Sequence, residues 1–198
     1  MSLEGRVETY LEYEIKDREG KIIKKGKVKA KSWVKNFARL IRTAIGYGGA
    51  GWVDREGTGH GVVRDNLPYL HAFAGEGNAN YGVLVGKGTS PPTKDDASDV
   101  YDLADQIPHG DGDNMLHYMG TDEVDISVSD KTVTYKWTRD FKNNGSVDVT
   151  IKEVALAVKL TLTGTDYYFL MFHTVLASPV SVPAGATITW RVVLKYTA

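Results

Sequence analysis

Residues 147–162 read VDVTIKEVALAVKLTL, and residues 167–176 read YYFLMFHTVL. In the first stretch Val147, Val149 and Ile151 alternate with polar residues, and this period of two is typical of a strand with one buried face. From residue 154 onward the apolar run has no polar face, so this part of the strand is expected to be buried. The turn residues 164–166 separate the two stretches, which therefore predict a pair of long neighbouring strands.

Shorter strands are predicted on both sides of this pair. They cover residues 116–119, 124–128, 133–138 and 188–194, with turns at 129–132 and 143–145 and an open crossing at 179–185. Strands that recur every 12–20 residues with little helix between them favour an antiparallel β-sandwich or jelly roll. We therefore expect a mainly β fold, with the main β region at residues 115–198.

The first 45 residues predict a β-hairpin followed by an amphipathic helix. Alternation on both sides of the turn at 17–20 places the hairpin at residues 6–31. Ser32 is the expected N-cap of a helix over 32–45, which ends at Gly46. Its apolar stripe comprises Trp33, Val34, Phe37, Leu40, Ile41, Ala44 and Ile45. Either this helix closes one end of the β core, or its basic side docks on a partner or on nucleic acid.

Residues 46–114 differ from the rest of the chain because glycine clusters interrupt them repeatedly. They predict long loops with a short strand at 81–85 and one helical turn at 100–104. Long loops within a compact domain are usually functional or lie against a neighbour. The length of 198 residues suits a single domain covering 1–198.

The net charge of −1 conceals two segregated blocks of charge. Residues 21–53 contain nine basic residues and no acid, whereas residues 95–130 contain eleven acids and no Lys or Arg. We infer that the basic block of one copy can meet the acidic block of the next copy or of the same chain. The residues of this candidate assembly surface are Lys25, Lys27, Lys29, Lys35, Arg39, Arg42, Asp95, Asp96, Asp99 and Asp102.

The chain contains no cysteine, which excludes disulfides, a thiol nucleophile and cysteine-ligated metal sites. The N-terminus lacks the apolar region of a secretory signal, and no apolar run reaches the ~18–20 residues of a membrane-spanning helix. We therefore expect a protein made in a cytoplasm that does not enter the membrane.

Catalytic motifs are absent from the sequence. None of the five histidines lies in a His-Glu-x-x-His motif, and there is no G-x-S-x-G or complete phosphate-binding loop. The glycines at 75, 77, 86 and 88 are better explained as turn residues. We therefore expect no enzymatic activity and no cofactor.

Two other features of the sequence leave a binding site open, one for calcium and one for a carbohydrate or a partner. Asp111 and Asp113 resemble half of a calcium loop between His109 and His117, but the spacing lacks the downstream glutamate, so a plain turn competes with a calcium site. An exposed Trp52 or Tyr47 would suit binding to a carbohydrate or a partner, whereas core packing explains most aromatic residues.

Six stretches of the chain resemble structural proteins of tailed phages and related viruses, and they occur in the same order. They are SWVKNFARL at 32–40, VLVGKGTSPPT at 83–93, FKNNGS at 141–146, VTIKEVAL at 149–156, YFLMFHTVL at 168–176 and SPVSVPAGA at 178–186. Together they cover about a quarter of the chain and are spread over residues 32–186. The sequence departs from the pattern at Ala155, where glycine is usual, and at Lys87, where a small polar residue is usual.

The resemblance implies a virion component: a capsid, head-decoration or tail-associated subunit that assembles with copies of itself and other virion proteins. Its location would be the virion, after synthesis in the host cytoplasm. A carbohydrate-binding or receptor-recognition β-sandwich is the alternative, with a glycan as ligand. A nucleic-acid partner through residues 21–42 is a weaker hypothesis.

Overall fold

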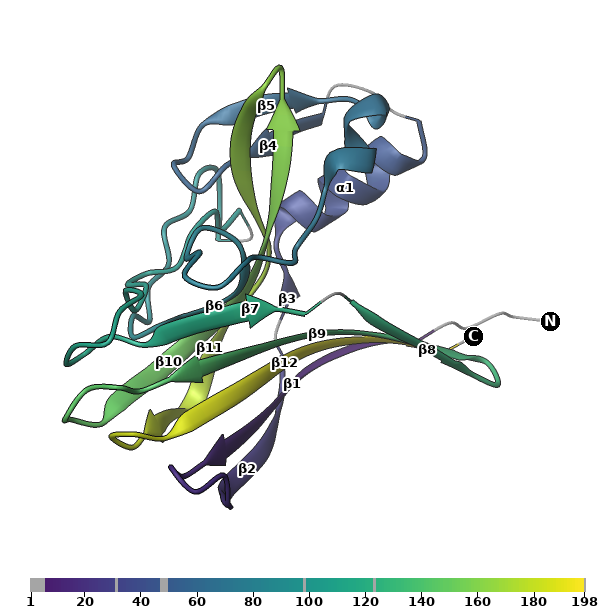
Figure 1. The fold of residues 1–198 in the computed structure, drawn as a ribbon. Coiled ribbons are helices and arrows are strands. Elements are labelled where there is room, and N and C mark those ends of the chain that lie inside the picture. Colours follow the sequence, from purple (N-terminus) through teal and green to yellow (C-terminus); the bar gives the residue numbers. More distant parts are fainter. Residues whose placement is uncertain (1–5, 31, 47–49, 98, 123, 198) are drawn as a thin grey trace.

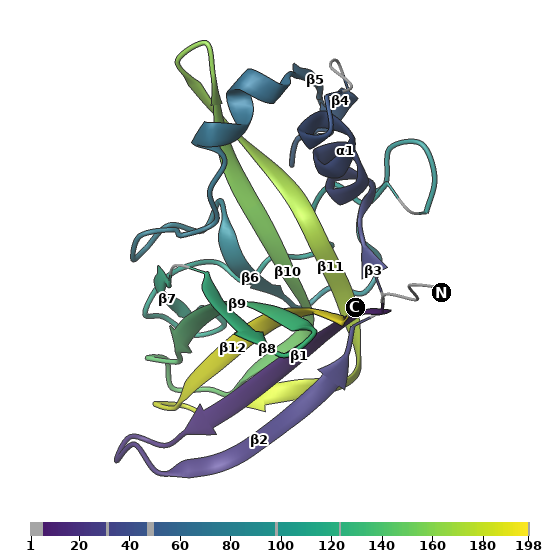
Figure 2. The same ribbon diagram turned by 90° about the vertical axis from the view of Figure 1, so that its right-hand side faces the viewer.

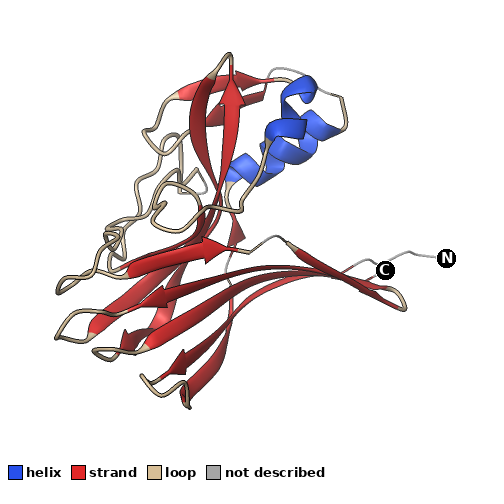
Figure 3. Cartoon of the chain, in the orientation of Figure 1, coloured by secondary structure: helices blue, strands red, loops and turns tan. Residues whose placement is uncertain are grey.

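The structure is a computed structural model that describes residues 6–197, apart from residues 31, 47–49, 98 and 123. It is mainly β, with antiparallel sheets (Figures 1 and 3). The strands are β1 (Arg6–Lys16), β2 (Ile22–Lys29), β3 (Ser32–Trp33), β4 (Ala50–Val53), β5 (Gly59–Val62), β6 (Gly82–Gly86), β7 (His117–Thr121), β8 (Asp125–Ser129), β9 (Thr132–Lys142), β10 (Val149–Leu162), β11 (Thr165–Val182) and β12 (Thr187–Thr197). The helices are α1 (Lys35–Ala44) and the 3-10 helix η1 (Arg64–Tyr69).

Two sheets dominate the fold, and neither closes into a barrel. The first has the order β2-β1-β12-β9-β7, with β8 paired to a different part of β9. The second has the order β3-β11-β10-β6. The predicted hairpin at 6–31 is present as β1 and β2, and the stretch that opens the sequence analysis forms β10 and β11.

The buried apolar residues form one continuous cluster to which both sheets contribute. Leu11, Phe141 and Trp190 of the first sheet share it with Leu156 and Phe172 of the second sheet, all of them essentially without solvent exposure. Of the three alternating apolar residues at 147–151, Val149 and Ile151 are buried as expected, whereas Val147 is 42% exposed.

A buried arginine ties the loop before β6 to the first sheet. Arg139 of β9 donates hydrogen bonds to the carbonyls of Asn78, Tyr81, Val83 and Met119, at distances of 2.6–3.1 Å. Burial lowers the pKa of Arg139 to about 10, so the guanidinium keeps its charge at neutral pH.

Several predicted details are wrong. Ser32 does not cap the helix: it belongs to β3, and Val34 occupies the N-cap position without a side-chain hydrogen bond. The predicted helical turn at 100–104 is absent. The predicted crossing at 179–185 is largely strand, because β11 continues through Pro179 to Val182. A bulge opposite residue 152 accommodates this proline, which therefore disrupts no ladder of hydrogen bonds.

A buried carboxylate holds the long loops on β10. Glu153 is fully buried and accepts hydrogen bonds from the backbone N–H groups of Gly88, Ala104 and Asp105, at 2.9–3.1 Å, and from His173 Nε2 at 2.9 Å. Burial by itself raises the pKa of Glu153, but these hydrogen bonds outweigh it and hold the pKa below 4.5. At Gly86, a Cβ atom would collide with the Glu153 side chain, so close packing explains this glycine.

We predict that Glu153→Gln lowers the free energy of unfolding by about 3 kcal/mol, because an amide N–H₂ would face backbone donors where an oxygen now accepts. Urea denaturation measures this loss. The matched control is Glu12→Gln, since Glu12 is partly exposed and lies 3.7 Å from Lys27. The control should change the free energy by less than about 0.5 kcal/mol.

The difference between wild type and Glu153→Gln should also depend on pH. A carboxylate with a lowered pKa stabilises the fold above its unfolded pKa, and the contribution disappears as pH falls through the folded-state pKa. A difference that stays constant from pH 7 to the acid transition would contradict this role.

Candidate assembly surface

The first sheet extends sideways beyond the second sheet. We call this extension the wing; it comprises residues 6–10 of β1, 193–197 of β12, 132–136 of β9, and β8. It projects to the right in Figure 1, below α1, and it faces the viewer in Figure 2. Its inner face continues the face that covers the core elsewhere in the sheet.

Two rows of uncharged side chains cover the inner face of the wing. The strand registers place one row as Val7, Tyr196, Val133 and Val128, and the next row as Thr9, Leu194, Tyr135 and Ile126. Exposed fractions reach 71% for Val128, 60% for Val7 and 54% for Ile126. The face therefore has the composition of a core but remains in contact with solvent.

Trp33 marks the border between the covered and the uncovered parts of this face. Its indole Nε1 donates a hydrogen bond to Thr9 Oγ1 at 2.8 Å, and its ring lies 6.4 Å from that of Trp137. β3 contains only Ser32 and Trp33, so the second sheet ends at this point. The next row inward contains Leu11 and Val192, which are fully buried.

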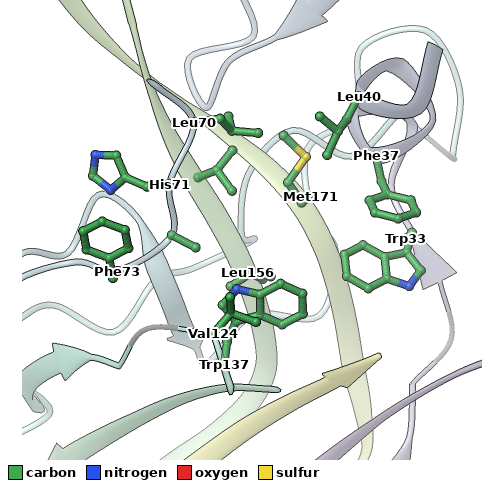
Figure 4. A pocket seen from close by; sticks show the side chains of 12 residues that line it. Trp33, Phe37, Leu40, Leu70, His71, Phe73, Val124, Trp137, Leu156 and Met171 are labelled. Atoms are coloured by element: carbon green, nitrogen blue, oxygen red, sulfur yellow. The ribbon is translucent and has the colours of Figure 1, made fainter. Parts of the chain in front are cut away.

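An apolar groove of about 250 Å³ adjoins this border (Figure 4). It lies between α1, the segment after η1, and the strands β9, β10 and β11. The residues that line it are Trp33, Phe37, Leu40, Leu70, His71, Ala72, Phe73, Val124, Trp137, Leu156, Val158 and Met171. Burial lowers the pKa of His71, so its imidazole contributes a neutral ring to the groove.

Helix α1 directs part of its apolar stripe outward. Its buried positions are polar: the Asn36 side chain pairs with the backbone of Val53 at 2.6 and 3.0 Å, and Thr43 accepts a hydrogen bond from the Trp52 indole at 3.2 Å. Ile41 is 49% exposed and Ile45 is 72% exposed. Because residues four apart share a helix side, Ile41 continues the apolar surface that Phe37 begins in the groove.

The lysines of β2 lie outside this apolar surface. Lys25 and Lys27 are paired in register with Glu14 and Glu12, on the outer face of the first sheet. Lys27 Nζ lies 3.7 Å from the Glu12 carboxylate and 3.3 Å from the centre of the Tyr10 ring. Lys29 is exposed at the end of the same strand. This half of the basic block therefore lies next to the glutamates of β1.

The helical half of the basic block meets the acidic block within the chain. Lys35 lies 2.5 Å from Asp96, and Arg39 forms a two-pronged ion pair with the buried Asp99 at 2.7 and 3.0 Å. Asp95 is exposed and acts on Lys35 through its charge. Two further residues of the predicted set lie elsewhere: Arg42 is exposed on α1, and Asp102 pairs with Arg55 at 2.6 Å.

Asp111 and Asp113 are engaged in turn hydrogen bonds. Asp113 accepts from the backbone and side chain of Ser146, and Asp111 accepts from Asn144 at 2.7 Å and faces His117 Nδ1 at 2.9 Å. Among the described residues no group of three or more His, Asp or Glu side chains is arranged to hold a metal ion. The turn interpretation fits these contacts better than a calcium site.

Trp52 is not available to a ligand, because it is fully buried against Phe169. Tyr47 lies outside the described residues.

The sequence does not predict the wing. Alternation at residues 7–9, 126–128 and 133–135 indicates an apolar face, but the same alternation is expected whether that face is covered by the same chain or by another molecule. No residue pattern in these strands distinguishes the two cases.

Comparison of the chain with known protein families, with curated proteins and with solved structures yields no match. In the part of the chain that the structure describes, no helix has the length and apolar character needed to cross a membrane.

The pairing of His117 generates a pH prediction. Its Nε2 lies 2.7 Å from Glu76 and its Nδ1 2.9 Å from Asp111, and these hydrogen bonds outweigh desolvation and raise the pKa of His117 above 6.5. Because folding raises this pKa, the protonated His117 ring stabilises the fold below pH 6.5, and this contribution disappears as pH rises through the folded-state pKa. The stability difference between wild type and His117→Gln should therefore shrink above pH 6.5.

Proton NMR checks this prediction residue by residue. The ring protons of His117 should titrate with a midpoint above 6.5, whereas those of His71 should titrate below it because burial lowers its pKa. A His117 midpoint at or below that of His71 would contradict the pairing.

Proposed function

We propose that this chain is a structural subunit of a virus particle and that its copies associate through the inner face of the wing. The observation that carries the proposal is the uncovered, uncharged face of Val7, Ile126, Val128 and their neighbours. Contiguous apolar patches of a few hundred Å² on a folded chain often mark an interaction site.

The size of this surface suits an interface. Four strands about 4.8 Å apart and two rows about 6.7 Å apart make a face of roughly 250 Å² on the wing alone. The groove and Ile41 extend it toward the largest apolar patches on monomers, about 300–600 Å², which are often functional. A stable interface buries about 800 Å² on each partner, so polar surface around this apolar centre must also take part.

A second copy is the partner that this face fits best. The two rows carry no charge, so identical faces can approach each other without repulsion, whereas a partner selected by charge would find no complementary group. Sheets pack face to face about 10 Å apart, and two wings would supply each other with the missing second layer. Such a contact has two-fold symmetry and would complete a β-sandwich around each wing.

The viral assignment rests on the resemblance of six ordered stretches to tailed-phage and related structural proteins. A virion subunit has to expose the surface that its neighbours will bury, and the wing supplies such a surface. Capsid, head-decoration and tail-associated roles are equally compatible with it.

The test is sedimentation of single-residue variants on β8. Ile126→Asp or Val128→Asp would place a charge in the apolar contact, so we expect self-association to weaken at least about 100-fold, measured by analytical ultracentrifugation over a concentration series. Ser127→Asp is the matched control, because Ser127 is exposed on the opposite face of the same strand. A wild-type chain that stays monomeric at about 100 µM would overturn the proposal.

A triple variant tests whether self-association uses the wing or the charge blocks; in it Glu replaces Lys25, Lys27 and Lys29. These side chains lie outside the inner face, so the oligomer mass should be unchanged. A fall in mass for this variant, with none for Val128→Asp, would place the contact on β2 instead.

A further inference from the structure

A second, polar cleft lies away from the wing and the groove. It has a volume of about 570 Å³, within the range of small-ligand sites. The turn after β4, the loop before β6, the loop at 102–106 and the start of β11 surround it. The lining residues are Asp54, Arg55, Glu56, Asn80, Asp102, Gln106, Thr165, Asp166, Tyr167 and Tyr168.

The two tyrosines of the cleft are half-buried and held by other rings. Tyr167 packs on His60 with ring centres 4.0 Å apart, and His60 is itself held by Asp54 at 2.6 Å. Tyr168 stacks on Tyr81 at 5.7 Å with the planes 15° apart. Little rotational freedom therefore remains to be lost when a ligand packs against these rings.

Hydrogen bonds also hold three polar side chains of the cleft, those of Arg55, Asp102 and Gln106. Arg55 donates to Asp102 at 2.7 Å, to the carbonyl of Asn80 at 2.7 Å and to the Gln106 side chain. Gln106 in turn donates to the carbonyl of Ala79 at 2.7 Å. This network positions carboxylate and amide oxygens around the aromatic rings.

Two of the four carboxylates of the cleft are paired with cations. Asp102 pairs with Arg55, and Asp166 pairs with Lys159 at 3.1 Å and accepts from Thr161 at 2.6 Å. Hydrogen bonds from Thr161 and Lys159 hold the pKa of Asp166 below its usual value. With Asp54 and Glu56 the cleft holds four acidic side chains against these two cations, so it repels an anionic ligand and offers acceptor oxygens to the hydroxyl groups of a neutral one.

We propose that this cleft binds a neutral oligosaccharide. A sugar ring presents C–H groups on its faces, one of which can pack against the Tyr167 ring, and hydroxyl groups at its rim. Those hydroxyls can donate charge-assisted hydrogen bonds to the oxygens of Asp102 and Glu56. The proposal is independent of the wing, because the cleft and the wing share no residue.

The test begins with a printed array of neutral, sialylated and sulfated oligosaccharides. We expect binding to neutral glycans, and the strongest of these is then titrated calorimetrically against variants. Tyr167→Leu keeps an apolar side chain on His60 but removes the aromatic ring, and Asn80→Ala removes an exposed amide at the rim. Each should weaken binding at least about tenfold, with an unchanged melting temperature as evidence of folding.

The matched control is Tyr10→Leu, on the outer face of the first sheet beneath Lys27, which should bind like wild type. Three outcomes would overturn the proposal. They are an array without any neutral glycan bound, a preference for sialylated or sulfated glycans, and equal affinity of wild type and Tyr167→Leu. None of these outcomes depends on whether the chain self-associates.

Discussion

The fold depends on the hydrogen bonds that surround one buried carboxylate, that of Glu153. A carboxylate without solvent would be costly, so its oxygens require the three backbone N–H groups and the imidazole that surround them. Those N–H groups belong to the loop between β6 and β7, which has little regular structure of its own. The same interaction thus stabilises the centre of β10 and fixes a loop whose further residues line the polar cleft and pair with α1.

The molecule uses one side of one sheet for two purposes. Near its middle, the inner face of the first sheet is covered by β10 and β11 and becomes core. In the wing the same face continues without a cover, and α1 contributes Phe37 to the adjoining groove. The polar contacts of Asn36 and Thr43 explain this orientation of the helix, because they bind its other side to β4.

Sequence reasoning predicts the elements whose signal is local. The hairpin of β1 and β2, the strands β6, β8, β9 and β10, and the existence of α1 all follow from periodicity and turn residues. It fails where contacts between residues far apart in the sequence determine the local structure. The hairpin of β4 and β5, the burial of Trp52 and the buried side of α1 depend on pairings between Asn36, Thr43 and β4. The cleft is likewise invisible, because its residues come from four separate segments.

The lysines of β2 disfavour the addition of a further strand at the β2 edge of the first sheet. β2 is the outermost strand on its side of the first sheet, so its outer backbone groups could accept another strand. An added copy of β2 would bring its own row of lysines against Lys24, Lys25, Lys27 and Lys29, at the spacing of neighbouring strands. This repulsion disfavours runaway, fibril-like extension of the sheet at that edge.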